Sequence, residues 1–403
     1  MRPLALLFLA AAPVMAQQTP AARQTDAAAY TRYELLAPGS AQFRIIYEIT
    51  ATTPGATAYY NPIRMGSTAS DESVIDRATG KPLAFAEVGA AEARAGGVRV
   101  PNEQQRYIKV TLARAVPANG GEQRILILKT YRDTASYFTR GDTIVFTRPL
   151  GIKRNAVVLP KGYELVSSTF PAQVLQEPDG RVGISFWNST PSEAAVVMRA
   201  VPLRAPLAAA PRRAATFADR LDERAHQNRE IVYFLQPPET HAFDLYHDYT
   251  ESRPGISNYI NVVRAGSTVS APSAINLDTG EPVPFEVLKG AAITRAGFDV
   301  ADVTPTTEAV VFKFPPVRAG TSVRLRMSET YTDSARYRLE GDELVWDRSF
   351  GRPSNILVLP SGWVLTNSSV SATVSTRPDG RVQLDFINGR NDEIAVLITA
   401  RRR

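Results

Sequence analysis

The feature that most constrains the fold of this chain is an internal duplication with a constant offset of 200 residues. The matching positions include tyrosines, acids, glycines and an asparagine, and their spacing is identical in the two copies. They are Thr130, Tyr131, Asp133, Tyr137, Gly141, Asp142, Arg148, Gly151, Asn155, Leu159, Pro160 and Gly162 in the first copy, and Thr330, Tyr331, Asp333, Tyr337, Gly341, Asp342, Arg348, Gly351, Asn355, Leu359, Pro360 and Gly362 in the second. A repeat of this length predicts one fold written twice.

Each copy has the periodicity of β-strands. Apolar side chains alternate along stretches such as 43–49, which is typical of strands. Asp179-Gly180 and Asp379-Gly380 lie between strand-like runs and are two-residue hairpin signals. Many short strands closed by Gly, Pro or Asp turns favour antiparallel sandwiches over parallel α/β units. The sequence therefore predicts an all-β protein of two tandem homologous antiparallel β-sandwich domains, joined by a linker and one short helix.

The junction between the copies is rich in Ala, Pro and Arg over 202–215, a composition typical of a linker. Thr216 and Asp219 resemble a capping box, and Phe217, Leu221 and Ala225 fall on one helical stripe, so a helix is expected over 217–229. The expected division of the chain is a signal peptide over 1–16, a leader over 17–32, repeat 1 over 33–203, the linker and helix over 204–230, and repeat 2 over 231–403.

The amino terminus indicates export. Met1-Arg2 precedes a short apolar run, and small residues surround a cleavage point near Ala16, as in a secretory signal. The run is too short to span a bilayer, and no later stretch of eighteen apolar residues follows it. We expect a periplasmic or extracellular protein without a membrane span. The chain contains no cysteine, so the mature domains rely on their cores rather than on disulfides.

Charge and metal-ligand content exclude several classes of function. The net charge is +6, but the arginines are scattered, without the basic face and interleaved aromatics of a nucleic-acid-binding protein. His226, His241 and His247 invite a zinc hypothesis. However, His241 and His247 on one strand would lie ~20 Å apart, and His-Glu-x-x-His does not occur. We therefore expect no metal, no cofactor and no nucleic-acid partner.

Carboxylates supply the alternative function, a secreted hydrolase of glycosidase type that uses acids of repeat 2. Glu343 with Asp347, or Asp333 with Asp342, would be the paired carboxylates that such chemistry needs. An acid beside an arginine is more commonly an ion pair, and an Asp in a turn commonly caps the chain. No Gly-x-Ser-x-Gly nucleophile motif and no phosphate-binding glycine loop occurs. The sequence thus favours a protein that is not an enzyme.

Ligand-binding candidates are the polar residues that both copies keep outside the evident turns. Planar amides and guanidinium groups suit sugar hydroxyls or peptide backbones, although they also suit fastening a sheet edge. The candidates are Asn61, Arg64, Arg148 and Asn155 in repeat 1, and Asn261, Arg264, Arg348 and Asn355 in repeat 2.

Differences between the copies suggest where binding would occur. Repeat 2 has Glu329 where repeat 1 has Lys129, and it also has acids at positions 343 and 347, where repeat 1 has threonines. If a single copy binds a ligand, we expect it to be repeat 2.

The order of elements in each copy loosely resembles the amino-terminal β-domain of zinc aminopeptidases. This order is an extended start at a tyrosine, a Thr-Gly-x-Pro turn, a long strand and then Thr-Tyr-x-Asp. The family's His-Glu-x-x-His is absent, so the resemblance implies a β-domain and no peptidase activity. The sequence as a whole predicts an exported, non-catalytic binding or scaffold module for an envelope protein or a polysaccharide.

Overall fold

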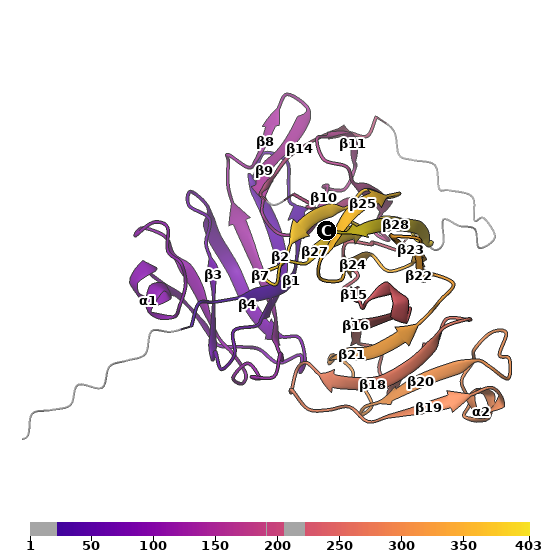
Figure 1. The fold of residues 1–403 in the computed structure, drawn as a ribbon. Coiled ribbons are helices and arrows are strands. Elements are labelled where there is room, and N and C mark those ends of the chain that lie inside the picture. The colour runs from indigo at the N-terminus through magenta and orange to yellow at the C-terminus, as the bar shows by residue number, and fades with distance from the viewer. Residues whose placement is uncertain (1–21, 191, 205–221) are drawn as a thin grey trace, which may run out of the picture.

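The computed structural model describes residues 22–190, 192–204 and 222–403. The signal peptide expected over 1–16 lies outside these residues. The chain is nearly all β, in two similar halves, as predicted (Figure 1). Among the described residues, no helix is long and apolar enough to cross a membrane.

Among the described residues, the first half contains fourteen strands and one short helix. They are β1 (Asp26–Leu35), β2 (Gln42–Ala51), β3 (Ala58–Pro62), β4 (Thr68–Asp76), β5 (Phe85–Val88), α1 (Ala90–Ala95), β6 (Tyr107–Thr111), β7 (Gln123–Arg132), β8 (Tyr137–Arg140), β9 (Thr143–Leu150), β10 (Arg154–Val158), β11 (Tyr163–Ser168), β12 (Gln173–Gln176), β13 (Val182–Trp187) and β14 (Ala194–Pro202).

The second half repeats this order, and its described residues add a 3-10 turn. Its elements are β15 (Glu230–Leu235), η2 (Pro238–Thr240), β16 (Ala242–Glu251), β17 (Asn258–Val262), β18 (Thr268–Asn276), β19 (Phe285–Lys289), α2 (Ala291–Arg295), β20 (Glu308–Lys313), β21 (Val323–Thr332), β22 (Tyr337–Glu340), β23 (Glu343–Phe350), β24 (Ser354–Val358), β25 (Trp363–Ser368), β26 (Thr373–Thr376), β27 (Val382–Ile387) and β28 (Ile394–Arg402). Strand bounds such as those of β2 and β16 differ by 200 residues, which confirms the duplication.

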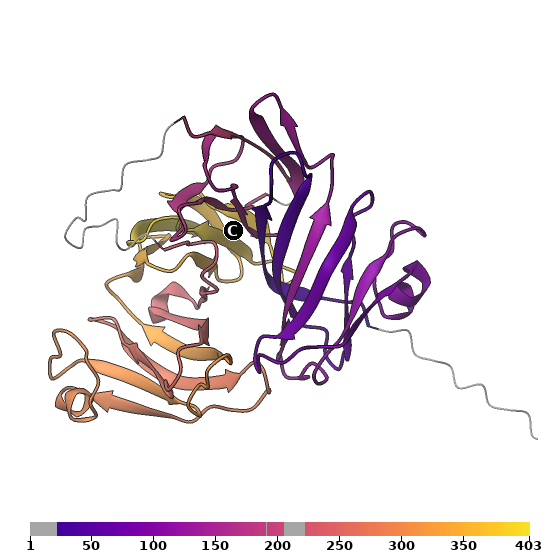
Figure 2. The same cartoon turned by 180° about the vertical axis from the view of Figure 1, so that it is seen from behind.

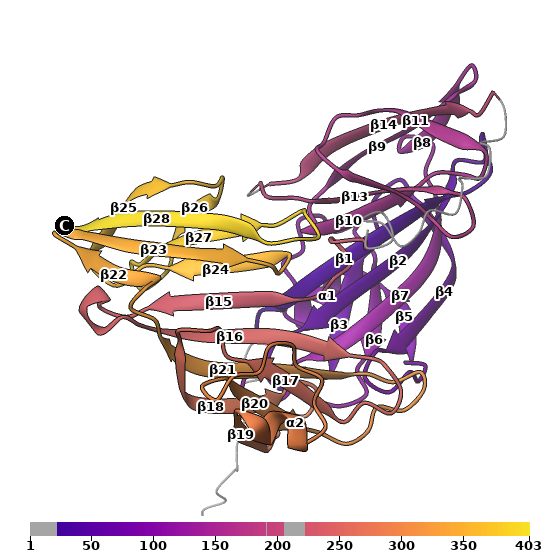
Figure 3. The ribbon, with the colours of Figure 1, turned by 90° about the vertical axis from the view of Figure 1, so that its right-hand side faces the viewer.

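Each half is built on a seven-stranded sheet, in the order β12-β13-β10-β1-β2-β7-β4 in repeat 1 and β26-β27-β24-β15-β16-β21-β18 in repeat 2. β1 pairs with β10 in parallel, as β15 does with β24, and the other neighbours pair antiparallel. A four-stranded and a three-stranded sheet complete each half, and Figure 3 shows these smaller sheets of repeat 2 in different parts of that half.

The core of repeat 1 lies between the seven-stranded sheet and both smaller sheets. Ile45 and Tyr131 of the large sheet share one buried cluster with Val110 of the three-stranded sheet and Phe146 of the four-stranded sheet. Both small sheets therefore cover the same face of the large one. In repeat 2 the buried apolar residues fall into two clusters, one under each small sheet, so the apolar core is interrupted between them.

The expected leader and the expected linker helix both differ from the sequence prediction. β1 begins at Asp26, inside the segment expected as a leader, because that segment pairs with both β2 and β10. Residues 222–229 contain a turn and no helix, so the helix prediction is wrong there, and its part over 217–221 lies outside the described residues. Arg154 donates to the carbonyls of Ala225 and His226 at 3.1 and 3.2 Å. These carbonyls are thus satisfied by tertiary contacts rather than by helical N–H groups.

The two halves lie side by side (Figure 2), and a buried network of charges joins them. Arg124 of β7 forms a bidentate pair with Asp278, with both N–O distances at 2.8 Å. Arg324, its counterpart in β21, lies 2.6 Å from Glu122 and 3.4 Å from Asp248. Burial raises the pKa of Glu122. Equivalent arginines on the two repeats thus meet at one interface, as in an approximately two-fold arrangement.

Candidate ligand-binding site

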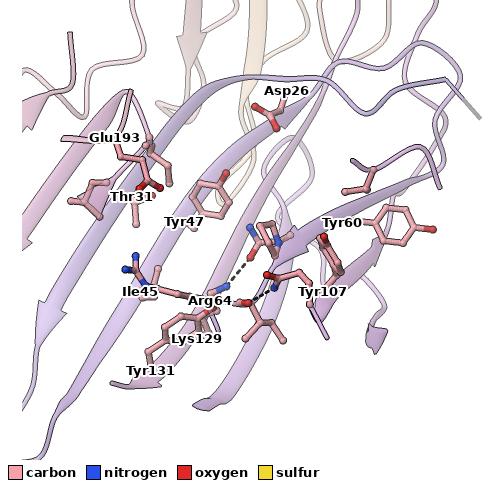
Figure 4. Close-up of a pocket in the computed structure, with 18 of the residues that line it drawn as sticks. Asp26, Thr31, Ile45, Tyr47, Tyr60, Arg64, Tyr107, Lys129, Tyr131 and Glu193 are labelled. Atoms are coloured by element: carbon pink, nitrogen blue, oxygen red, sulfur yellow. Dashed lines mark hydrogen bonds between the residues drawn. The ribbon is translucent and has the colours of Figure 1, made fainter. Parts of the chain in front are cut away.

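A pocket of about 570 Å³ opens in repeat 1 where the inner face of β3 lies over the seven-stranded sheet (Figure 4). Strands β1, β2, β3 and β7 contribute side chains to its walls, and the turn after β9 closes one side. Its most evident feature is a group of six tyrosines, which are Tyr33, Tyr47, Tyr59, Tyr60, Tyr107 and Tyr131. Tyrosine combines an apolar ring with a hydroxyl that both donates and accepts hydrogen bonds.

Strand alternation places Tyr33, Tyr47, Tyr59 and Tyr131 in one core, whereas Tyr60 and Tyr107 belong to a separate cluster with Ala93 of α1. Ile45 lies opposite Lys129 in the pairing of β2 with β7, so the two side chains share one face of the sheet. Tyr47 and Tyr131, each two residues further along its own strand, point to the same side. Asn61 comes from β3, which lies over this face.

The polar centre of the pocket is the pair Lys129 and Asn61. The Lys129 Nζ donates to the Asn61 Oδ1 at 2.7 Å and lies 4.8 Å from the Tyr131 ring centre. Lys129 is 4% exposed, and burial lowers its pKa to about 8. An ammonium group has three donors. Since Asn61 is its hydrogen-bond partner within the described part of the chain, two donors remain available to a ligand.

A second polar group lies at the amino-terminal end of the pocket. The Tyr59 hydroxyl donates to the Asp26 Oδ2 at 3.2 Å. Burial raises the pKa of Asp26, and burial together with the neighbouring Tyr47 and Asp26 raises that of Tyr59 well above its ordinary value. The tyrosines of this wall therefore stay neutral at physiological pH and act as hydrogen-bonding groups.

The counterpart of the pair in repeat 2 has the opposite charge. Asn261 donates to the Glu329 Oε2 at 2.6 Å and to the Tyr331 hydroxyl at 3.0 Å. Burial raises the pKa of Glu329. The same amide position therefore accepts from a buried cation in repeat 1 and donates to a buried acid in repeat 2.

The region of repeat 2 that corresponds to the pocket also contains an arginine side chain. Arg352 occupies the position of Ile152, which lines the pocket of repeat 1. Its Nη2 lies 2.9 Å from the His247 Nδ1 and 3.4 Å from the Tyr259 hydroxyl. These two residues correspond to the pocket residues Tyr47 and Tyr59. Arg352 thus extends into the space that remains open in repeat 1.

His247 makes stability depend on pH in a defined range. Burial, followed by the charge of Arg352, holds its pKa well below the ordinary 6.5. The folded protein keeps this imidazole neutral, whereas the unfolded chain takes up a proton below about pH 6.5. The free energy of unfolding is therefore expected to decrease as pH falls below that value, by up to about 1.4 kcal/mol per pH unit, until the folded pKa is reached.

The measurement is urea unfolding at about pH 7.5 and about pH 5.5 of the wild type and of His247→Gln, which retains an acceptor for Arg352. We expect the wild type to lose about 1 kcal/mol more than the variant over this interval. An identical loss in both proteins would show that His247 does not titrate in this way.

The other candidates named from the sequence are distributed unevenly around the pocket. Arg64 lies at its rim, with an Nη1 contact of 3.4 Å to the Pro149 carbonyl. Arg264 instead contacts the Ser349 hydroxyl at 3.0 Å and Glu393 at 3.4 Å. Of these two equivalent arginines, Arg64 therefore has fewer side-chain partners than Arg264.

Arg148 and Arg348 are held by buried acids. Arg148 lies 3.1 Å from Asp133, and Arg348 lies 3.0 Å from Asp333. Although burial opposes it, hydrogen bonds from Ser136 and the charge of Arg148 hold the pKa of Asp133 below its ordinary value. Arg148 borders the pocket, but its guanidinium is already paired, so its main contribution is to the wall.

Asn155 and Asn355 lie away from the pocket and are buried. Their side-chain amides donate to the carbonyls of Ile152 and Arg352 at 2.6 and 2.7 Å. They fasten the turn before β10 and β24, which in turn positions the residues at 152 and 352. Both are therefore positioning residues for this turn.

The acids proposed for the alternative hydrolase lie in different settings. Asp333 is buried and ion-paired, whereas Asp342 is exposed at the tip of the β22–β23 hairpin. Glu343 accepts from Thr366 at 3.1 Å and lies 3.5 Å from Arg401. In residues 22–190, 192–204 and 222–403, no group of three or more His, Asp or Glu side chains is placed to hold a metal ion.

Lys129 and the tyrosines were missed as site residues. The signal was the inward strand face of residues 125, 127, 129 and 131, which places a lysine among apolar side chains. A charged residue on a buried face needs a partner, and that need identifies the site once the fold is known.

No family model matches the chain, and no curated protein matches its sequence. Among solved structures, the M1 zinc metallopeptidase from Deinococcus radiodurans aligns with 10% identity and a TM-score of 0.30, covering 45% of this chain and 42% of that one. A two-domain M1 zinc metallopeptidase variant bound to L-tryptophan aligns with 10% identity and a TM-score of 0.29, covering 43% and 41%.

The aligned part thus spans about two-fifths of these peptidase chains. Both of these structures are zinc peptidases, the family that the sequence pattern loosely resembles. At these scores the likeness remains a loose resemblance and defines neither the fold nor an activity.

Proposed function

We propose that the chain is an exported, non-catalytic binding module and that the tyrosine-lined pocket of repeat 1 binds a saccharide unit of an envelope polysaccharide. The supporting observation is the pocket itself, in which four tyrosines of the repeat 1 core, Tyr33, Tyr47, Tyr59 and Tyr131, line a space that contains a buried ammonium group with unused donors. Aromatic walls with a few convergent polar groups are typical of ligand sites. This assignment places binding in repeat 1, not in repeat 2 as the acid content suggested.

The space around position 152 provides a matched pair of variants. Ile152→Arg introduces into repeat 1 the residue that extends between His247 and Tyr259 in repeat 2. Arg352→Ile makes the reverse change at the equivalent position. Both exchanges use residues that the duplicated fold already accommodates, so they separate loss of binding from loss of folding.

The experiment is a screen of soluble cell-wall and capsular polysaccharides against the wild type, followed by titration calorimetry of any ligand found. Ile152→Arg is expected to weaken binding by roughly tenfold or more, whereas Arg352→Ile is expected to leave the affinity at repeat 1 unchanged. Binding that survives Ile152→Arg, or no binding across the panel, would contradict the proposal. Cell fractionation and sequencing of the mature amino terminus, expected just after Ala16, test the export.

A further inference from the structure

We propose that the repeat 1 pocket takes an acidic sugar of the uronic-acid type, with the sugar carboxylate bound by Lys129. This inference rests on the proposed function and adds the charge and chemical class of the ligand. Its basis is the difference between two copies of one fold, in which the same position is a cation facing an open pocket and an acid facing an internal arginine.

The charge of the pocket favours an anion. Lys129 has two N–H groups without a partner in the described part of the chain, and hydrogen bonds between ammonium and carboxylate are among the strong ones. The guanidinium of Arg64 contacts a single backbone carbonyl. Arg99 lies on the rim and is exposed. Of the acids that line the pocket, Asp26 is already hydrogen-bonded to Tyr59, and Glu193 is exposed.

The corresponding region of repeat 2 contains its own counter-charge. Arg352 supplies an internal cation near the buried Glu329, and it is fixed by His247 and Tyr259. The charges of this space are therefore balanced within the chain. In repeat 1 the corresponding Ile152 is apolar. Glu72 acts on Lys129 through its charge, but the hydrogen bond of the ammonium group goes to Asn61, so an external carboxylate would take the donors that Asn61 leaves free.

The walls favour a sugar over a peptide. A bound peptide strand would add to the free edge of β3, where backbone N–H and carbonyl groups are available for pairing. That edge is blocked at its centre, because Gln24 accepts from the Tyr60 N–H at 2.8 Å and donates to the Tyr60 carbonyl at 3.1 Å. The tyrosine rings and hydroxyls that remain suit the faces and hydroxyls of a sugar ring.

The test compares three probes on the wild-type protein by titration calorimetry. They are a short galacturonic acid oligomer, its methyl-esterified form and a tripeptide with a free carboxyl terminus. The acid oligomer is expected to bind roughly 10- to 100-fold more tightly than the ester, which is the range for a hydrogen bond to a charged group. The tripeptide is expected not to bind.

Lys129→Glu is the matched variant, because Asn261 already donates to a glutamate at this position of repeat 2. It is expected to lose the preference for the acid oligomer, while circular dichroism shows an unchanged fold. Equal binding of acid and ester would overturn this inference and leave the proposed function standing. Preferential binding of the tripeptide would overturn the inference in favour of a peptide ligand, and binding of no saccharide in the wider panel would overturn both proposals.

Discussion

Replacing Asp278 by alanine is expected to lower the free energy of unfolding by about 3–5 kcal/mol, the usual cost of leaving a buried charge without its partner. Asp278 accepts two hydrogen bonds from the Arg124 guanidinium at 2.8 Å and one from the backbone N–H of Arg324 at 3.0 Å. The Arg124 and Asp278 side chains are 7% and 6% exposed. Alanine would leave the guanidinium buried between the repeats without a bidentate acceptor.

Urea unfolding followed by circular dichroism measures this effect. Because the pair joins the two repeats, the variant is also expected to unfold in two separate transitions, one for each repeat. The double variant Arg124→Met with Asp278→Leu removes both charges and is expected to regain most of the lost stability. A loss below about 1 kcal/mol, as for a surface ion pair, would show that the network does not hold the repeats together.

Replacing Asp333 by alanine is expected to have an effect of similar size, about 3–5 kcal/mol. The Asp333 Oδ2 accepts from Arg348 at 3.0 Å and from the Ser267 hydroxyl at 2.8 Å. Its Oδ1 accepts from the Arg336 N–H at 3.1 Å. The variant would leave Arg348 buried against Phe243 and Trp346 without its carboxylate.

Asp342→Ala is the control for this change, since Asp342 is exposed at a hairpin tip. It is expected to alter the free energy of unfolding by no more than about 0.5 kcal/mol. Thermal or urea unfolding of both variants decides between a structural role and the catalytic role that the paired acids suggested. An Asp333→Ala protein of wild-type stability would remove the argument for the structural role.

The duplication made most of the architecture predictable. The spacing from Tyr131 to Gly162 recurs without an insertion at Tyr331 to Gly362, and alternation such as that of residues 43–49 identifies strands directly. Local signals of this kind depend on near neighbours in the chain, and they were sufficient for the all-β class and the two similar halves.

The predictions failed for segments whose conformation is set by tertiary contacts. The capping pattern at Thr216 and Asp219 favoured a helix through residue 229, but Arg154 and Arg324 draw the backbone carbonyls of the segment 222–229 into contacts with the two repeats. The parallel pairing of β1 with β10 joins residues more than a hundred positions apart. A sequence pattern that reports local periodicity does not contain such pairings.

The candidate site was predicted in part. Asn61 and Arg64 were selected because both copies retain them, and both border the pocket. The same criterion also selected Asn155, which fastens the turn before β10, and Arg148, which forms part of the pocket wall. It could not select Lys129 or Ile152, because repeat 2 has different residues, Glu329 and Arg352, at these positions.

The central claim is that repeat 1 binds its ligand in the pocket around Lys129, while Arg352 closes the equivalent space in repeat 2. A crystal structure of the protein with a galacturonic acid oligomer tests this claim most directly. The account predicts one oligomer in repeat 1, with its carboxylate at the Lys129 Nζ and its ring against the tyrosines. An oligomer beside His247 in repeat 2, or one bound outside the pocket of repeat 1, would contradict it.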